Sequence, residues 1–191
     1  MQTRGHALAD GQVLIIREAV ETDAPEALAF ANATSRESSF LSFGAGEFGF
    51  TEPQERAFIR ECAGSDTHLF IVGLIDDTLV SLLSFTPGAR PRHRHAGEFG
   101  LSVRRPYWGM GIGSFMLDAL LTWAQRDEMI TKINLRVRSD NARAIALYER
   151  KGFVVEGTLT RAVRIDGQYY DDLLMGKAVS RDPGAGGQGV R

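Results

Sequence analysis

Three glycines at alternate positions, Gly109, Gly111 and Gly113, separate a predicted strand from a long amphipathic pattern. Glycine at the start of a helix lowers its stability by roughly 0.5–1 kcal/mol relative to alanine, so a role as simple spacers does not explain all three. They provide a backbone without Cβ atoms and several N–H groups that have no internal partner in the first helical turn. Such a turn, at the positive end of the helix dipole, binds phosphate or pyrophosphate oxygens. The chain is therefore predicted to place a strand, a phosphate-binding loop and a helix in succession.

Length and composition limit the protein classes that fit. A chain of 191 residues, 43% of them hydrophobic, suits one compact domain. A net charge of −2 argues against a general nucleic-acid or membrane-surface binder, and the short basic cluster at residues 90–95 lacks interleaved aromatic residues. No stretch approaches the roughly 18 apolar residues that a membrane span needs. We expect a cytoplasmic protein that binds neither nucleic acid nor membrane.

The cysteine and histidine content gives no sign of a metal site. Cys62 is the only cysteine, which excludes an intrachain disulfide framework and a thiolate metal site. His93 and His95 are the only closely spaced histidines, and they have no further ligand partner in the pattern, so we predict no metal. The predicted organisation is a flexible N-terminus at residues 1–11, a single domain at 12–179, and a disordered tail at 180–191 that contains Pro183 and four glycines.

The order of hydrophobic patterns predicts an α/β fold. Apolar runs predict strands at residues 13–18, 69–75, 79–85, 96–103, 132–138, 154–163 and 169–179. Helices are predicted after Thr22 or Asp23, after Thr51, after Gly113 and at residues 141–151, and residues 35–50 read as an irregular, aromatic-lined connection. Hairpin turns at residues 76–77 and 166–167 predict a mixed, mostly antiparallel central sheet of about seven strands, flanked by about four helices.

Two other phosphate-binding loops compete with this interpretation. A nucleoside-triphosphate loop needs Lys and then Ser or Thr after its last glycine, whereas Ser114 follows Gly113 directly. A dinucleotide loop needs G-x-G-x-x-G directly after a strand, whereas this loop is G-x-G-x-G and follows a connection that contains Pro106. Asp140, beyond the next strand, could imitate the acid that binds a ribose, so the dinucleotide alternative stays open on the glycines alone.

A second motif lies about thirty residues after the loop. It consists of Asn141, Ala144, Tyr148, Gly152 and Phe153, in the spacing Asn-x-x-Ala-x-x-x-Tyr-x-x-x-Gly-Phe. Together with the glycine loop, this chain resembles the GCN5-related N-acetyltransferase (GNAT) superfamily over about residues 13–179. The ending at residues 165–175 looks like a subgroup that includes bacterial L-amino-acid N-acyltransferases.

The resemblance implies acetyl-CoA as the acyl-donor cosubstrate and no metal. The residues it assigns to cofactor binding are Leu101, Val103, Trp108, Gly109, Met110, Gly111, Ile112, Gly113, Ser114 and Asn141. Leu101 and Val103 would use their backbone on the pantetheine arm. Arg143 would approach the 3′-phosphate end, with a solvated helix residue as the alternative, and the alternative for Asn141 is a helix cap alone. Trp108 stands where the family's loop usually has Gln or Arg, but phosphate binding runs mainly through backbone N–H groups.

The resemblance also implies direct transfer of an acetyl group to an amine, which needs a base for the amine and an acid for the departing thiolate. Tyr148 is the implied acid; a core aromatic is the alternative for this residue. Glu98 is the implied base, and strand alternation places it with Gly100 and Ser102, opposite the face of Phe99. An exposed carboxylate, or one paired with an arginine, is the alternative for Glu98.

The acceptor site should be formed by the segments that vary within the family, residues 35–50 and the last hairpin. Its predicted residues are Glu37, Phe40, Tyr170, Asp171 and Asp172, whose acidic members favour an ammonium-bearing acceptor. The predicted activity is N-acetylation of the primary amine of a small molecule such as an amino acid, and a homodimer is possible. The alternatives are a protein N-terminal or lysine acetyltransferase and a non-catalytic acyl-CoA-binding regulator.

Overall fold

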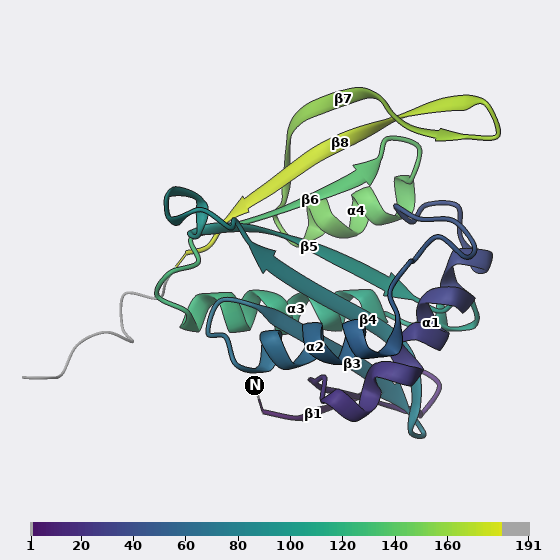
Figure 1. Cartoon of the computed structure of the whole chain (residues 1–191), viewed down its shortest axis with the longest axis vertical. Coiled ribbons are helices and arrows are strands. Elements are labelled where there is room, and N and C mark those ends of the chain that lie inside the picture. Colours follow the sequence, from purple (N-terminus) through teal and green to yellow (C-terminus); the bar gives the residue numbers. More distant parts are fainter. Residues whose placement is uncertain (1, 181–191) are drawn as a thin grey trace, which may run out of the picture.

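An eight-stranded sheet with helices on both faces forms the protein (Figure 1). The computed structural model describes residues 2–180. The strands are β1 (Arg4–Ala7), β2 (Val13–Glu18), β3 (Leu69–Ile75), β4 (Thr78–Pro87), β5 (Ala96–Val103), β6 (Lys132–Arg138), β7 (Val154–Ile165) and β8 (Gln168–Ala178). The α-helices are α1 (Ala24–Glu37), α2 (Glu52–Ala63), α3 (Ile112–Arg126) and α4 (Ala142–Arg150).

The strands follow the order β1-β2-β3-β4-β5-β6-β8-β7. Only the β5–β6 pair is parallel, and the other neighbours are antiparallel, which confirms the predicted mixed, mostly antiparallel α/β sheet. The turn between β7 and β8 has positive φ at Asp166 and Gly167, 47° and 83°, as expected for the hairpin predicted there.

The strand β1 raises the number of strands from the predicted seven to eight. Its residues 4–7 pair with β2, for example Gly5 with Ile15, so the prediction of a flexible segment over residues 1–11 is wrong for this part. The strand is short and mostly exposed, and it carries no alternating hydrophobic pattern. Pairing with the edge of β2, rather than its own sequence pattern, accounts for it. Of the predicted disordered tail, residues 181–191 lie outside the described residues.

The predicted irregular connection is shorter than expected, because α1 continues through Ser35 to Glu37. The connection ends at Thr51, which begins α2 as its N-cap. The Gln54 side chain accepts hydrogen bonds from the N–H and the hydroxyl of Thr51, both at 2.8 Å, and so holds the first turn.

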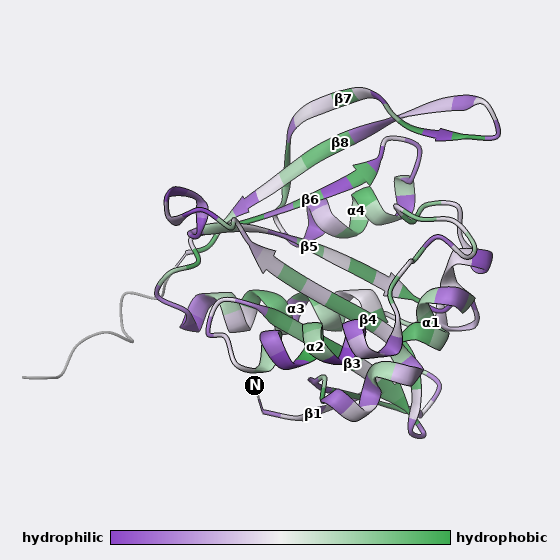
Figure 2. Ribbon diagram, in the orientation of Figure 1, coloured by the Kyte–Doolittle hydropathy of each residue, from purple (hydrophilic) through white to green (hydrophobic). Residues whose placement is uncertain are grey.

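The two faces of the sheet carry different helices. α1 and α2 cover one face through a cluster that includes Phe30, Ile59, Phe70 and Val72, whereas α3 and α4 pack on the other face. β3 is buried along its whole length because both of its faces are covered. Figure 2 shows hydrophobic residues concentrated in the central strands and along α3, with hydrophilic stretches on the outer turns of α1 and α2.

β5 and β6 run together for only three residue pairs, from Ala96 opposite Lys132 to Glu98 opposite Asn134. Beyond Glu98 the two strands leave this segment in different directions (Figure 1). Among the described residues, 99–103 of β5 therefore pair with β4 alone, and their backbone toward β6 lacks a neighbouring strand. This divergence lies directly before the glycine loop and positions the candidate site.

Candidate functional site

The glycine loop presents free N–H groups at the start of α3. Gly109 and Gly111 have φ values of 89° and 83°, a left-handed conformation that glycine adopts without a Cβ clash. The N–H groups of Ser114 and Phe115 bond to the carbonyl of Gly111, while those of residues 109–113 have no acceptor within the described residues. The loop thus has a backbone geometry that suits an anion, and its role in phosphate binding stays a prediction.

Gly113 allows close packing and has no left-handed φ. A Cβ atom at this position would lie 3.1 Å from Leu147 Cδ2 and 3.8 Å from Leu101 Cδ2. The first turn of α3 therefore meets α4 and β5 at Gly113. The distance between the two helices at this point depends on the absence of a side chain.

Trp108 fixes the loop to the end of β5 and to α4. Its indole Nε1 donates a hydrogen bond of 2.7 Å to the carbonyl of Val103. The guanidinium of Arg143 lies 5.1 Å from the centre of the indole ring, and that of Arg105 lies 5.9 Å from it. The Val103 carbonyl therefore already accepts a hydrogen bond. Of Leu101 and Val103, whose backbones are predicted to contact pantetheine, Leu101 is the more available.

Glu37, predicted at the acceptor site, instead supports the approach to the glycine loop. Its Oε1 accepts a hydrogen bond from Arg104 Nε at 2.8 Å, and its Oε2 accepts one from the backbone N–H of Arg105 at 2.7 Å. Both carboxylate oxygens are engaged, so Glu37 offers no free charge to an ammonium group. It ties the last turn of α1 to the start of the loop.

Tyr148 packs into the core with its ring and leaves its hydroxyl accessible. The residue is 8% exposed, and its ring lies 5.7 Å from that of Phe99 and 6.1 Å from that of Phe153. Within residues 2–180 no fully buried side-chain oxygen lacks a partner, and Tyr148 makes no hydrogen bond, so its hydroxyl must reach accessible space. Burial raises the pKa of Tyr148 to about 12, which keeps the phenol protonated at neutral pH. The core packing and the predicted role as an acid are compatible.

Asn141 orients the helix that carries this tyrosine. Its Oδ1 accepts a hydrogen bond of 3.2 Å from the N–H of Ala144 and so caps α4. Gly152, with φ of 82°, follows the end of α4 and turns the chain toward β7. The motif residues therefore fix both ends of the helix beneath Tyr148.

Glu98 reaches the divergence of β5 and β6 from the face opposite to Tyr148. It is the last β5 residue paired with β6, and the next residue, Phe99, points to the other face and contacts Tyr148. The Glu98 side chain is 52% exposed, and its Oε2 lies 3.5 Å from Arg136 Nε. The two predicted catalytic residues thus lie on opposite faces of the sheet, beside the point where the β5–β6 pairing opens.

A buried arginine that no sequence motif indicates contacts two of the predicted acceptor residues, Phe40 and Tyr170. Arg138 is 6% exposed and donates two hydrogen bonds to Asp140, at 3.0 and 2.6 Å, and one to the Ser39 carbonyl at 2.8 Å. Its guanidinium lies 3.8 Å from the ring centre of Tyr170 and 4.7 Å from that of Phe40. Arg138 therefore joins the connection after α1 to β6 and β8.

Asp171 and Asp172 differ in how they are used. The Oδ1 atom of Asp171 accepts a hydrogen bond of 2.7 Å from the backbone N–H of Arg161, which holds a bulge of β7. Asp172 pairs with Arg138 along the strands, and burial raises the pKa of its carboxyl, with Arg136 and Arg138 opposing and Asp171 reinforcing the shift. Because Asp172 has no hydrogen bond within the described residues, it is the freer carboxylate of the two.

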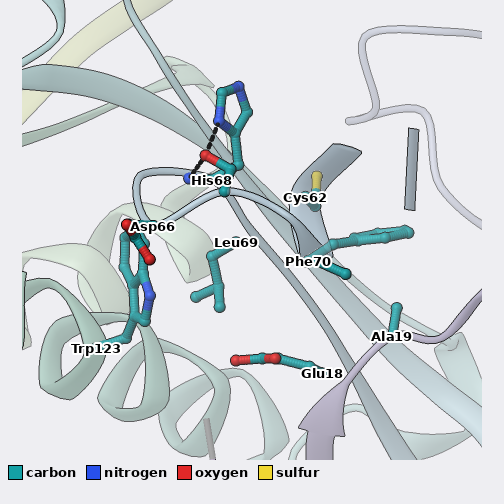
Figure 3. Close-up of a pocket in the computed structure, with 10 residues that line it drawn as sticks. Glu18, Ala19, Cys62, Asp66, His68, Leu69, Phe70 and Trp123 are labelled. Atoms are coloured by element: carbon teal, nitrogen blue, oxygen red, sulfur yellow. Dashed lines mark hydrogen bonds between the residues drawn. The ribbon is translucent and has the colours of Figure 1, made fainter. Parts of the chain in front are cut away.

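A separate cavity of about 270 Å³ lies away from all these groups (Figure 3). Its lining comes from the ends of β2 and α2, the start of β3, and Trp123 of α3, and includes Cys62 and His68. Burial raises the pKa of the Cys62 thiol to about 11, which leaves it unreactive at neutral pH. None of the predicted site residues lines this cavity.

The chain is similar to known proteins over the region that carries the candidate site. A family model described as "Acetyltransferase (GNAT) family" matches residues 33–153, which include the glycine loop and Tyr148. The chain belongs to the GNAT family. The acetyltransferase of the GNAT family from Streptococcus pneumoniae has the same fold, with a TM-score of 0.85 and 32% identity over 87% of this chain and 99% of that one.

Two curated relatives are similar over a shorter region. The L-amino acid N-acetyltransferase AaaT of Escherichia coli (strain K12) is 30% identical over 107 residues, 56% of this chain and 66% of the relative. A spermidine N(1)-acetyltransferase of Vibrio cholerae is 29% identical over 117 residues, 61% of this chain and 60% of the relative. The chain thus spans about two thirds or less of these GNAT relatives.

GNAT membership resolves the alternative that the glycines left open. Asp140, which could have imitated the ribose-binding acid of a dinucleotide site, instead pairs with Arg138. Within residues 2–180, no three His, Cys, Asp or Glu side chains are grouped so that they could hold a metal ion. No helix in the same range is both long and apolar enough to cross a membrane.

Proposed function

We propose that this GNAT protein transfers the acetyl group of acetyl-CoA to the primary amine of a small molecule. The observation that carries the proposal is the end of the β5–β6 pairing at Glu98, with Glu98 on one face of the sheet and Tyr148 on the other. The GNAT relatives named for acetylation of an amino acid and of spermidine support a small amine as acceptor.

The donor side is suited to a long phosphorylated thioester. The unpartnered N–H groups of residues 109–113 would hold its pyrophosphate, and the unpaired backbone edge at residues 99–103 would hold the pantetheine arm. Arg143, held over Trp108, adds positive charge at the same end. Acetyl-CoA supplies the activated acyl group, and the chain supplies its placement.

The proposed chemistry moves protons at both sides of the opening. Glu98 accepts a proton from the acceptor ammonium, directly or through a water, so that a nitrogen lone pair can attack the acetyl carbon. The N–C bond forms, the C–S bond breaks, and the nitrogen loses its second proton to solvent. Tyr148, which its pKa of about 12 keeps protonated, donates a proton to the departing sulfur.

A small acceptor is favoured over a protein chain by the contacts around Arg138. This arginine joins Ser39 and Phe40 to Tyr170, so the connection after α1 is tied to the last hairpin beside the open face. A peptide substrate needs an open groove that accepts an extended backbone. The contacts of Arg138 with both segments restrict the space beside the site and so favour a small acceptor.

The test is release of the CoA thiol from acetyl-CoA with a panel of L-amino acids, polyamines and aminoglycosides. We expect turnover with one class of amine and its loss in Tyr148→Phe. If acetyl-CoA raises the melting temperature but no small amine is acetylated, the small-acceptor proposal fails. A peptide panel would then separate a protein acetyltransferase from a non-catalytic acyl-CoA-binding regulator.

A further inference from the structure

Two arginines on the same face of β6 are used in different ways. Arg138 is buried, and all three of its guanidinium nitrogens donate hydrogen bonds to Asp140 or to the Ser39 carbonyl. The side chain of Arg136 is 56% exposed, and its one ion pair joins Nε to Glu98 at 3.5 Å. Its two terminal nitrogens have no hydrogen-bond partner within the described residues. One arginine is structural, and the other holds an unused pair of donors.

Arg136 lies beside Glu98, where the β5–β6 pairing ends. β6 alternation places Arg136 on the same face as Asn134, which is paired with Glu98. Glu98 and Arg136 therefore present a negative and a positive charge 3.5 Å apart beside the divergence of the strands. The ammonium and carboxylate groups of an α-amino acid are carried by one carbon, so their recognition needs opposite charges that are immediate neighbours.

We propose that Arg136 determines acceptor specificity by binding the α-carboxylate of an amino acid, while Glu98 receives its α-ammonium. The planar guanidinium binds a carboxylate through two parallel N–H donors, a geometry that a lysine does not offer. The acceptor would replace the loose Glu98–Arg136 contact with two complementary ones and free Glu98 to act as base. This inference rests on the proposed acetyl transfer at the same site.

A simple amine or a polyamine matches the pair less well. Such an acceptor has no group for Arg136, whose positive charge would remain 3.5 Å from the carboxylate that must attract the ammonium. The remaining free carboxylate nearby, Asp172, would repel an acidic side chain on the acceptor and tolerate a neutral or basic one. The charges therefore favour amino acids with neutral or basic side chains.

The experiment compares amino acids with the amines that remain after loss of their carboxylate. We would measure kcat/KM for L-leucine against isoamylamine and for L-lysine against cadaverine, in the wild type and in Arg136→Gln. Loss of a charge-assisted contact should lower kcat/KM for the amino acids by about tenfold to a hundredfold, mainly through KM. The value for the amines should stay the same or rise. Arg136→Lys should restore only part of the preference, and Arg92→Gln, an exposed arginine outside the site, should change nothing.

An equal effect of Arg136→Gln on both members of each pair, or no effect on either, would overturn the assignment. Calorimetric titration of L-leucine and isoamylamine in the presence of CoA separates this result from failure of the proposed function. Binding of L-leucine that depends on Arg136 without any turnover would keep the carboxylate site and reject the acetyl transfer. If neither compound's binding depends on Arg136, the inference is rejected whatever the turnover.

Discussion

Backbone groups dominate on one side of the point where β5 and β6 separate, and side chains dominate on the other. On the side of α3 and α4, the backbone dominates: free N–H groups at residues 109–113, a glycine packed against Leu147, and an unpaired strand edge. On the other side, charged and aromatic side chains dominate, and they come from the connection after α1 and from β5, β6 and β8. Backbone geometry suits one invariable ligand, whereas side chains can be exchanged to suit different acceptors. The comparison predicts that mutations on each side will affect different substrates.

The largest expected effect is on the step that both sides share. Replacing Tyr148 with Phe keeps the packing against Phe99 and Phe153 and removes a hydroxyl that makes no hydrogen bond within residues 2–180. We expect kcat to fall by about 10²- to 10⁴-fold, as for loss of a general acid, with little change in the melting temperature. Stopped assays of thiol release and thermal denaturation measure the two quantities.

The control for both measurements is Tyr169→Phe. Tyr169 lies in the β7–β8 hairpin, is 45% exposed and contacts Arg161. This variant should retain full activity. Because the pKa of Tyr148 is about 12 and its unfolded value is near 10, its hydroxyl should cause no loss of kcat as pH rises to about 10. An alkaline decline near pH 8 that disappears in Tyr148→Phe would contradict the raised pKa.

On the donor side, Gly113→Val should weaken acetyl-CoA binding. A Cβ atom here would lie 3.1 Å from Leu147 Cδ2, so a branched side chain must push the start of α3 away from α4. We expect Kd for acetyl-CoA to rise about tenfold, equivalent to about 1.4 kcal/mol. Gly64→Val is the matched control, because its nearest neighbour would be a carbonyl at an ordinary 3.5 Å. Equal losses in both variants would assign the effect to stability rather than to the loop.

On the acceptor side, Arg138→Met should lower stability more than Arg136→Met. The first removes hydrogen bonds from a side chain that is 6% exposed, at a cost of about 1–3 kcal/mol, with Asp140 left partly accessible to water. The second removes an exposed pair, worth about 1 kcal/mol or less. Denaturant unfolding measures the difference, and equal free energies of unfolding would show that Arg138 does not hold the two segments together.

The smallest expected effect is that of Trp108→Phe. The change removes the 2.7 Å hydrogen bond from the indole to Val103 but keeps an aromatic ring beneath Arg143. A bond worth about 1 kcal/mol should raise Kd for acetyl-CoA by about fivefold. No change, or an improvement in Kd, would mean that the free Val103 carbonyl contributes more to cofactor binding than the bond it loses.

The donor side was the more predictable from sequence, for a physical reason. A turn of this kind depends on residues without Cβ atoms at fixed spacing, and the structure has left-handed φ at Gly109 and Gly111 and a close contact at Gly113. The α4 motif likewise specifies a cap, Asn141, and a terminating glycine, Gly152, both of which occupy those positions. A required backbone conformation at a turn or a helix end restricts the residue type at that position, so it can be recognised in the sequence.

The acceptor side depends on contacts between distant segments, which leave no such pattern. The strand alternation that predicted β6 gives Arg136 and Arg138 the same outward position and cannot show that only Arg138 is buried by Phe40 and Tyr170. Glu37 was placed at the acceptor site by its segment, yet its partners lie 67 and 68 residues away. β1 was missed because its pairing with β2 supplies what its own sequence lacks.

The most direct test of the two-sided site is to measure Kd for acetyl-CoA and KM for the acceptor in both Gly113→Val and Arg138→Met. The structure predicts a crossed result: Gly113→Val raises Kd for acetyl-CoA and leaves the acceptor KM within about twofold, whereas Arg138→Met raises the acceptor KM and leaves Kd for acetyl-CoA unchanged. If each variant weakens both substrates to a similar extent, the two faces of the opening act as one coupled site, and the division between backbone and side-chain recognition is wrong.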